Sequence, residues 1–220
     1  MTALNFDLEA DCVIIFMDTL VLRRDNKKPL KYASKIFPLP HHRGVLCGTG
    51  SASTIMDWFV YIQDHVIANT MNIPNKMAPS QLQEIHSKYD LNGTNGTTIY
   101  HFGFDPREEH GRIRGFAFRS TNNFSLEELK DGIGIKPPDD EIIKYLKDTL
   151  GTCSPEDLFI DIMKLQKRKD DEGSPEKRIG IGGSIHVLQF DKDRQFLWEC
   201  YNFDDYDETF SKMLSESTRV

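Results

Sequence analysis

The sequence predicts an α+β protein built as a four-layer αββα sandwich, in which two packed antiparallel sheets lie between helix pairs. Two observations predict this fold. Strand-like segments occur in consecutive blocks along the chain, and helix-like segments occur in pairs between those blocks. The expected order is four strands, two helices, three strands, two helices and two strands. Consecutive strands favour antiparallel sheets, and paired helices favour a separate layer outside each sheet.

The first nineteen residues contain the clearest strand pattern. Apolar and polar residues alternate over residues 4–8, and residues 12–17 form the unbroken apolar run of a strand covered on both faces. The polar residues 9–11 between them predict a hairpin loop. If the chain turns at the middle of that loop, paired residues have numbers that sum to twenty, so Thr2 lies opposite Asp18. Each residue also has an ordinary explanation, since Thr often follows an initiator Met and Asp often closes a strand as a turn residue.

The other expected strands are bounded by Gly, Pro and charged turn signals. They cover residues 30–39, 44–48, 97–104, 113–120, 131–135, 179–190 and 196–201, and residues 20–22 continue the second strand. Lys35 falls inside the third strand, and Gly48 ends the fourth. Small residues at 49–53 then let the backbone bend and leave N–H groups open where a helix starts.

Four helices are expected. The first has an apolar stripe with a 3.6-residue period that ends at Val66, and a shorter second helix has Ser80 as a possible cap. Asp139 or Asp140 caps the third helix. Ser154 caps the fourth, which has Pro155 in its first turn and a basic last turn.

Length and charge limit the classes of partner. The 220 residues fit one large domain, expected over residues 1–203, followed by an acidic mobile tail at 204–220. The net charge of −7, without a basic block, argues against nucleic acid and against an anionic membrane surface as partners. No apolar run approaches the roughly 20 residues of a membrane span, and no signal peptide is visible, so we expect a cytoplasmic protein.

No cofactor or metal is expected, because no two of the four cysteines have the spacing of metal ligands. Two weaker alternatives remain: a thiol enzyme that uses Cys47 with His41 or His42, and a metal at His101 and His110. The three Asn-X-Ser/Thr motifs, which begin at Asn92, Asn95 and Asn123, are interpreted as turns.

The order of elements and the N-terminal stretch resemble the N-terminal nucleophile (Ntn) hydrolases, specifically the proteasome β-type subunits. The resemblance implies that Thr2, freed of Met1, is a threonine nucleophile whose own α-amine is the general base. It also implies that Asp18 and Lys35 support Thr2, and that Gly48 supplies an oxyanion N–H. A Thr hydroxyl needs such a base, and an α-amine has a pKa of about 7.7 to 8. A preorganised N–H is worth roughly 3 kcal/mol in the transition state.

Two hypotheses follow from the resemblance. In the first, the protein is a homo-oligomeric, ring-forming threonine hydrolase that cleaves peptide or other amide bonds. In the second, it is a catalytically silent subunit with an assembly or binding role. The second arises because Arg178 and Ile181 stand where the family has Asp and Ser, and because the family's Gly-Ser-Gly element is present only as residues 132–134. The aromatic residues of the first helix, Trp58, Phe59 and Tyr61, favour an interface with another subunit.

Overall fold

The computed structural model describes residues 2–23, 26–89, 96–107, 111–174 and 178–217. Within these ranges the protein is a mixed α+β fold with five α-helices and three antiparallel sheets. His110 and the motifs at Asn92 and Asn95 fall wholly or partly outside the described residues, whereas Asn123 lies in a turn, as expected. Among the described residues, no helix has the length and apolar character that a membrane crossing requires.

The first sheet has the strand order β10-β1-β2-β11-β12. Its strands are β10 (Gly132–Lys136), β1 (Leu4–Leu8), β2 (Cys12–Asp18), β11 (Ser184–Asp191) and β12 (Gln195–Asn202). The second sheet has the order β5-β6-β7-β8-β9. Its strands are β5 (Ile36–Leu39), β6 (Gly44–Thr49), β7 (Thr98–Asp105), β8 (Arg112–Arg119) and β9 (Leu126–Glu128). A small third sheet pairs β3 (Leu20–Leu22) with β4 (Pro29–Tyr32).

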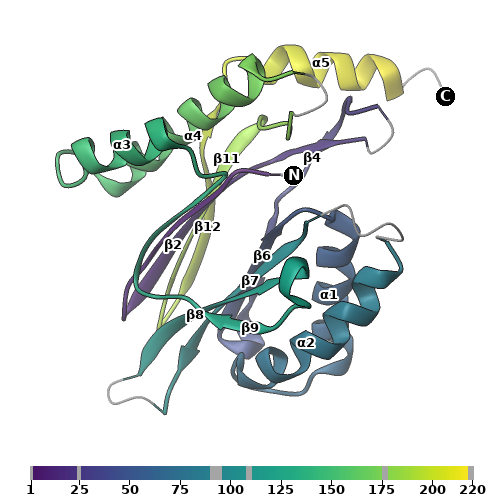
Figure 1. The fold of residues 1–220 in the computed structure, drawn as a ribbon, viewed down its shortest axis with the longest axis vertical. Coiled ribbons are helices and arrows are strands. Elements are labelled where there is room, and N and C mark those ends of the chain that lie inside the picture. The colour runs from purple at the N-terminus through teal and green to yellow at the C-terminus, as the bar shows by residue number, and fades with distance from the viewer. Residues whose placement is uncertain (1, 24–25, 90–95, 108–110, 175–177, 218–220) are drawn as a thin grey trace.

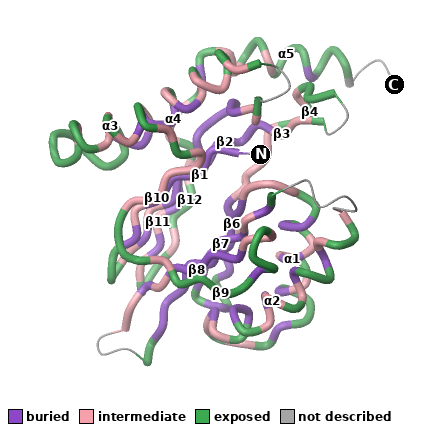
Figure 2. The backbone as a smooth tube through the Cα atoms, in the orientation of Figure 1, coloured by how far each residue is buried: buried purple, intermediate pink, exposed green. Residues whose placement is uncertain are grey.

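The helices lie on two sides of the molecule (Figure 1). Helices α1 (Ala52–His65) and α2 (Asn72–Ser87) lie beside the second sheet, whereas α3 (Asp140–Thr149), α4 (Pro155–Glu172) and α5 (Tyr206–Ser217) lie at the other end. Buried residues follow the strands and the inner faces of the helices, and exposed residues follow the outer helix faces (Figure 2).

Three apolar clusters form the core. One joins the facing sides of the two sheets, with side chains such as Ile15 and Phe102. A second packs α1 and α2 against the second sheet through Trp58 and Leu82, and a third includes Phe159 of α4 with apolar residues of the first sheet. Burial of these faces is the main favourable term in the folding free energy.

The hairpin between β1 and β2 forms, but its register is one residue from the expected one. Leu4 pairs with Met17 and Leu8 with Val13, so paired numbers sum to 21. The Glu9 N–H donates to the Cys12 carbonyl at 2.8 Å, which closes a two-residue loop instead of a three-residue one. Two-residue loops are the commonest hairpin connections because their twist matches that of the strands.

The strand expected over residues 30–39 is broken into β4 and β5, which belong to different sheets. The Ser34 hydroxyl donates to the Ile36 carbonyl at 3.1 Å and accepts from the Ile36 N–H at 3.4 Å. This local bonding competes with a continuous ladder. Lys35 therefore lies in the bend between two sheets.

Helix α2 begins earlier than expected, with Asn72 instead of Ser80 as its start, and Pro74 and Pro79 lie within it. Proline is tolerated in a first helical turn. Tertiary packing of the buried face, which extends from Ala78 to Leu82 and Ile85, outweighs the helix-breaking effect of the second proline.

The segment after Phe203, expected to be a mobile tail, contains α5. The Tyr206 ring stacks on Tyr32 at 4.6 Å, and the Tyr32 hydroxyl donates to the Tyr206 carbonyl at 3.0 Å. Met213 is buried farther along the same helix. Acidic residues in the first turn, which suggested a solvated tail, favour the positive end of the helix dipole.

The aromatic residues of α1 differ in burial, since Trp58 is buried whereas Phe59 and Tyr61 are half-buried. Trp58 is fully buried and stacks on Tyr61 at 5.5 Å, and Phe59 contacts Phe37 at 5.0 Å. The exposed apolar residues of α1 are Met56 and Val60. The aromatic residues therefore do not support the expected interface.

Candidate active site

Thr2 and Asp18 lie side by side at one end of the first sheet. The Thr2 hydroxyl donates to Asp18 Oδ1 at 2.8 Å, and the Ala3 N–H donates to the same oxygen at 2.9 Å. Thr2 precedes β1, so its backbone is outside the ladder and the one-residue register difference does not separate the two side chains. Asp18 is fully buried and Thr2 is only 6% exposed.

Lys35 reaches this pair from the bend between β4 and β5. Its Nζ atom donates to Asp18 Oδ2 at 3.0 Å and also to Thr2 Oγ1. The Lys35 side chain is 15% exposed, against 0% for Asp18. Burial lowers the pKa of Lys35, and the neighbouring Asp18 carboxylate opposes part of that shift. The Thr2 oxygen therefore donates to a carboxylate and accepts from an amine.

Gly182 supplies the fourth hydrogen bond to Asp18 among the described residues. Its N–H donates to Asp18 Oδ2 at 3.3 Å. Its carbonyl accepts from the Thr19 and Leu20 N–H groups at 3.2 and 3.0 Å. Both polar groups of this one peptide segment thus hold the end of β2, and Asp18 satisfies its two oxygens with three neutral donors and one amine.

Gly48 lies near the end of β6 and is buried. Ile36, which follows Lys35, pairs with Cys47, which precedes Gly48. A Cβ atom at Gly48 would lie 2.8 Å from the Thr98 carbonyl oxygen, which gives the glycine a packing reason as well. Its role as an oxyanion donor stays a prediction.

The residues at the positions of the family's Asp and Ser have other contacts. The exposed Arg178 donates from Nε to the Gly173 carbonyl at 3.0 Å and also donates to the Asp171 carbonyl, at the end of α4. Ile181 is buried in the apolar cluster beside α4. Within β10, Gly132 pairs with Leu8 and Gly134 with Phe6, so this glycine pair lies toward the far end of β1 from Thr2.

Several polar residues near the site were not singled out from the sequence. The Thr19 hydroxyl accepts from the Ser184 N–H at 2.8 Å and lies 3.2 Å from the Ser184 hydroxyl. The Asp170 carboxylate accepts three backbone N–H bonds from residues 179–181. A Gly-rich stretch after a helix was the only signal available, because partners 9 to 165 residues apart leave no local pattern.

The two alternative sites expected from sequence find no support in the geometry. Both ring nitrogens of the buried His101 are engaged: Nε2 accepts from Trp58 Nε1 at 2.8 Å, and Nδ1 lies 2.7 Å from the Asn75 side-chain oxygen. Burial lowers the pKa of His101 to about 3. Cys47 is buried between the two sheets, and burial raises the pKa of its thiol, which disfavours a thiolate nucleophile.

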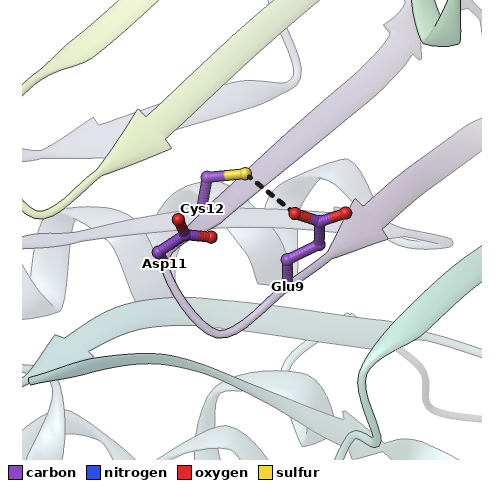
Figure 3. Close-up of side chains that lie close together, drawn as sticks. All are labelled: Glu9, Asp11 and Cys12. Carbon is purple, nitrogen blue, oxygen red and sulfur yellow. Dashed lines mark hydrogen bonds between the residues drawn. The ribbon is translucent and has the colours of Figure 1, made fainter.

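One other group of potential metal ligands is present in the described residues. Glu9, Asp11 and Cys12 of the β1–β2 hairpin have ligand atoms within 4.8 Å of one another (Figure 3). The pKa of Cys12 is raised to about 11 by burial and by the nearby carboxylates, so its sulfur stays protonated. This group lies at the opposite end of the hairpin from Thr2 and takes no part in the candidate site.

The protein thus has a mixed α+β fold in which two antiparallel sheets have helices beside them and Thr2 contacts Asp18 at the end of the first sheet, and solved structures share this fold. The solved structures to which it is similar are Anbu proteins. A Gly-1 mutant of Anbu from Hyphomicrobium sp. strain MC1 matches with a TM-score of 0.61 and 16% identity, over 100% of this chain and 96% of that chain. Anbu from Yersinia bercovieri, described as an ancestral β-subunit, matches with a TM-score of 0.59 and 13% identity, over 99% and 93% of the two chains.

At these identities the likeness shows the fold alone. A second Anbu structure from the Hyphomicrobium strain matches with a TM-score of 0.57 and 16% identity, over 100% of this chain and 95% of that chain. No protein-family model and no curated protein sequence matches this chain.

Proposed function

We propose that this protein is an N-terminal threonine hydrolase that cleaves peptide or other amide bonds. The observation that supports it is the position of the Thr2 hydroxyl, which donates to the buried Asp18 carboxylate while Lys35 donates to its oxygen. A Thr hydroxyl is a weak nucleophile unless a base and a charged neighbour assist it. Asp18 and Lys35 are the charged neighbours, distant from Thr2 in sequence but adjacent to it in space, and the proposed base is the α-amine of Thr2 itself.

The proposed reaction begins after Met1 is removed, because a Met1–Thr2 peptide bond would keep the Thr2 nitrogen as a non-basic amide. The Thr2 α-amine takes the hydroxyl proton as Oγ1 attacks the substrate carbonyl carbon. The tetrahedral intermediate then collapses: the carbonyl–nitrogen bond breaks, and the leaving amine takes the proton from the α-ammonium group. The Thr2 α-amine then takes a proton from a water molecule, which attacks the resulting ester. The carbonyl–Oγ1 bond breaks, and Oγ1 takes the proton from the α-ammonium group, which restores the Thr2 hydroxyl.

Lys35 and Asp18 have separate roles in this scheme. The Lys35 amine donates to Oγ1 and stabilises the negative charge that develops on that oxygen. Asp18 orients Lys35 through the 3.0 Å contact and keeps it charged, against the burial that lowers its pKa. Gly48, which follows the Cys47 that pairs with Ile36, is the proposed N–H donor to the oxyanion.

Further properties belong to the same proposal. We infer that the three apolar clusters are the interiors of a four-layer αββα sandwich. We infer also that the protein acts in the cytoplasm as a homo-oligomeric ring, which the Anbu-like fold and the exposed Met56 and Val60 support. The reduced state of all four cysteines agrees with a reducing compartment.

Intact mass combined with a threonine-directed electrophile tests the activity. The expected result is a chain that lacks Met1 and gains one equivalent of label at Thr2. Thr2→Ala should lose the label, Thr2→Ser should keep it, and Cys47→Ala should be labelled like the parent. Label that persists in Thr2→Ala would refute Thr2 as the nucleophile and direct attention to Cys47.

A silent subunit is the second candidate, and the contacts of Arg178 and Ile181 favour it. In the family, residues at these two positions help to orient the α-amine, whereas here one binds the end of α4 and the other lies in the apolar core. In this case the purified chain keeps Met1 and takes no label, although the contacts among Thr2, Asp18 and Lys35 still stabilise the fold.

A further inference from the structure

The end of α4 departs from the charge pattern that helices prefer. The basic last turn expected from the sequence is wrong, because the helix continues past Lys169 and its last turn contains Asp170, Asp171 and Glu172 in succession. Acidic residues are unfavourable there, because the helix dipole places partial negative charge at the C-terminus. Asp171 is paired with Lys167 at 2.9 Å, and Glu172 lies 3.9 Å from Arg168. Asp170 instead binds backbone N–H groups outside the helix, and these contacts offset its unfavourable position at the helix end.

Asp170 binds the chain that returns from α4 toward the first sheet. Its Oδ1 accepts from the Ile179 N–H at 2.7 Å, and its Oδ2 accepts from the Gly180 and Ile181 N–H groups at 2.8 and 3.1 Å. Three consecutive backbone donors directed at one carboxylate form a specific arrangement, since hydrogen bonds to an ionised acceptor are shorter and stronger than neutral ones. Asp170 therefore holds residues 179–181 in one conformation.

The next residue in the chain is Gly182, whose N–H donates to Asp18 and whose carbonyl binds the backbone at Thr19 and Leu20. Four consecutive backbone N–H groups thus connect the two carboxylates: those of residues 179–181 bind Asp170, and that of Gly182 binds Asp18. A change in the position of residues 179–181 would move the Gly182 N–H away from the Asp18 carboxylate.

Arg178 completes the attachment in the opposite direction. It donates to the Gly173 and Asp171 carbonyls at the end of the helix, where carbonyl groups need partners outside the helix. The Arg178 side chain of the loop therefore binds the helix end, and the Asp170 side chain of the helix binds the loop.

We propose that Asp170 is a positioning residue that fixes the loop of residues 178–183 so that the Gly182 N–H holds Asp18, and with it Lys35 and Thr2, in the reactive arrangement. Asp170 acts through Gly182 and touches none of the reacting groups. The inference uses the proposed function only for its effect on Thr2 labelling, and its effect on Gly182 is independent of any activity.

The test compares Asp170→Asn with Asp171→Asn, which removes the same charge one residue farther along α4. Hydrogen–deuterium exchange, resolved to single amides by mass spectrometry, reports residues 179–182, and a saturating threonine-directed electrophile reports Thr2. In Asp170→Asn we expect exchange at all four amides to accelerate at least roughly tenfold. The maximal labelling rate should fall by about the same factor with an unchanged half-saturating concentration. In Asp171→Asn the exchange rates of these amides and the maximal labelling rate should stay within about twofold of the parent.

Each outcome bears on the proposal. In Asp170→Asn, faster exchange at residues 179–181 with unchanged exchange at Gly182 would overturn the proposal. Asp170 would then hold the loop without influencing the hydrogen bond between Gly182 and Asp18. If the parent takes no label, the proposed function fails and the Gly182 amide alone decides, faster exchange supporting the positioning role and unchanged exchange overturning it. If Asp170→Asn does not fold, exchange in the parent decides: the Gly182 amide must be as slow as those of residues 179–181, and a faster Gly182 refutes the link.

Discussion

Replacing Lys35 with Met should destabilise the protein far more than removal of an ordinary lysine. Asp18 is fully buried, and among the described residues Lys35 is the one charged group that bonds to it. Met preserves most of the lysine side-chain volume, so the change removes mainly the charge. Breaking a buried ion pair from one side costs about 3 to 5 kcal/mol. The lower end, about 3 kcal/mol, applies here because three neutral donors to Asp18 remain.

Urea unfolding measures this loss directly. For a chain of this length, about 3 kcal/mol corresponds to a fall in Tm of roughly 6 to 12 °C. The matched control is Lys31→Met, an exposed lysine on β4, for which a change within about 0.5 kcal/mol is expected. Combining Lys35→Met with Asp18→Asn should cost less than the sum of the two single changes, because the second change removes the charge that the first leaves unpaired.

The pH dependence gives an independent check with a defined sign. Burial lowers the pKa of Lys35 in the folded protein, so in the window between that pKa and the ordinary lysine value of about 10.4 the unfolded chain binds more protons. The unfolding free energy of the parent should therefore rise with pH in that window, relative to Lys35→Met. A Lys35→Met variant within about 1 kcal/mol of the parent, or strict additivity in the double variant, would refute the reasoning.

Three further predictions follow from other buried groups. Acidification from about pH 6.5 toward 3 should destabilise the parent more steeply than His101→Gln, because the unfolded parent binds a proton at His101 that the folded protein, with a His101 pKa of about 3, does not bind; equal slopes in urea unfolding would contradict this. Cys153, which is exposed, should react with a thiol reagent at once and Cys47 only after unfolding; equal rates would exclude the described burial. Asn5→Ala should cost about 1 to 3 kcal/mol, since it leaves the Gln166 amide short of two partners, whereas a neutral result would mean that this pair is not buried.

The contact between Thr2 and Asp18 could be predicted because it depends on one hairpin. Alternation over residues 4–8 and an apolar run to Met17 define two strands, and a short loop between them leaves few possible registers. The error of one residue came from the loop, whose two-residue form has no clear sequence signal here: its central residues, Ala10 and Asp11, include neither Gly nor Asn. The contact between the Thr2 and Asp18 side chains still forms, because Thr2 lies before the strand and is outside the ladder.

The position of Lys35 beside Thr2 and Asp18 was harder to predict from local pattern, and it was predicted for a different reason. Residues 30–39 have the composition of one strand, and nothing local shows that Ser34 bends the chain there. A continuous strand would carry Lys35 in a ladder, whereas the bend places its side chain against Thr2 and Asp18. The resemblance to a family identified the residue, and the physical reason for its position became visible only with the tertiary structure.

The same limit explains why no residue of α4 was predicted to lie near the candidate site. Gln166 and Asp170 are four residues apart on α4, so they lie on the same face. Gln166 exchanges two hydrogen bonds with Asn5 of β1, the strand that follows Thr2, at 2.8 and 3.1 Å. Asp170 binds the loop that leads to Gly182 and Asp18. One face of one helix thus binds both the strand that follows Thr2 and the loop that binds Asp18, and these two attachments fix the positions of Thr2 and Asp18 relative to the same helix.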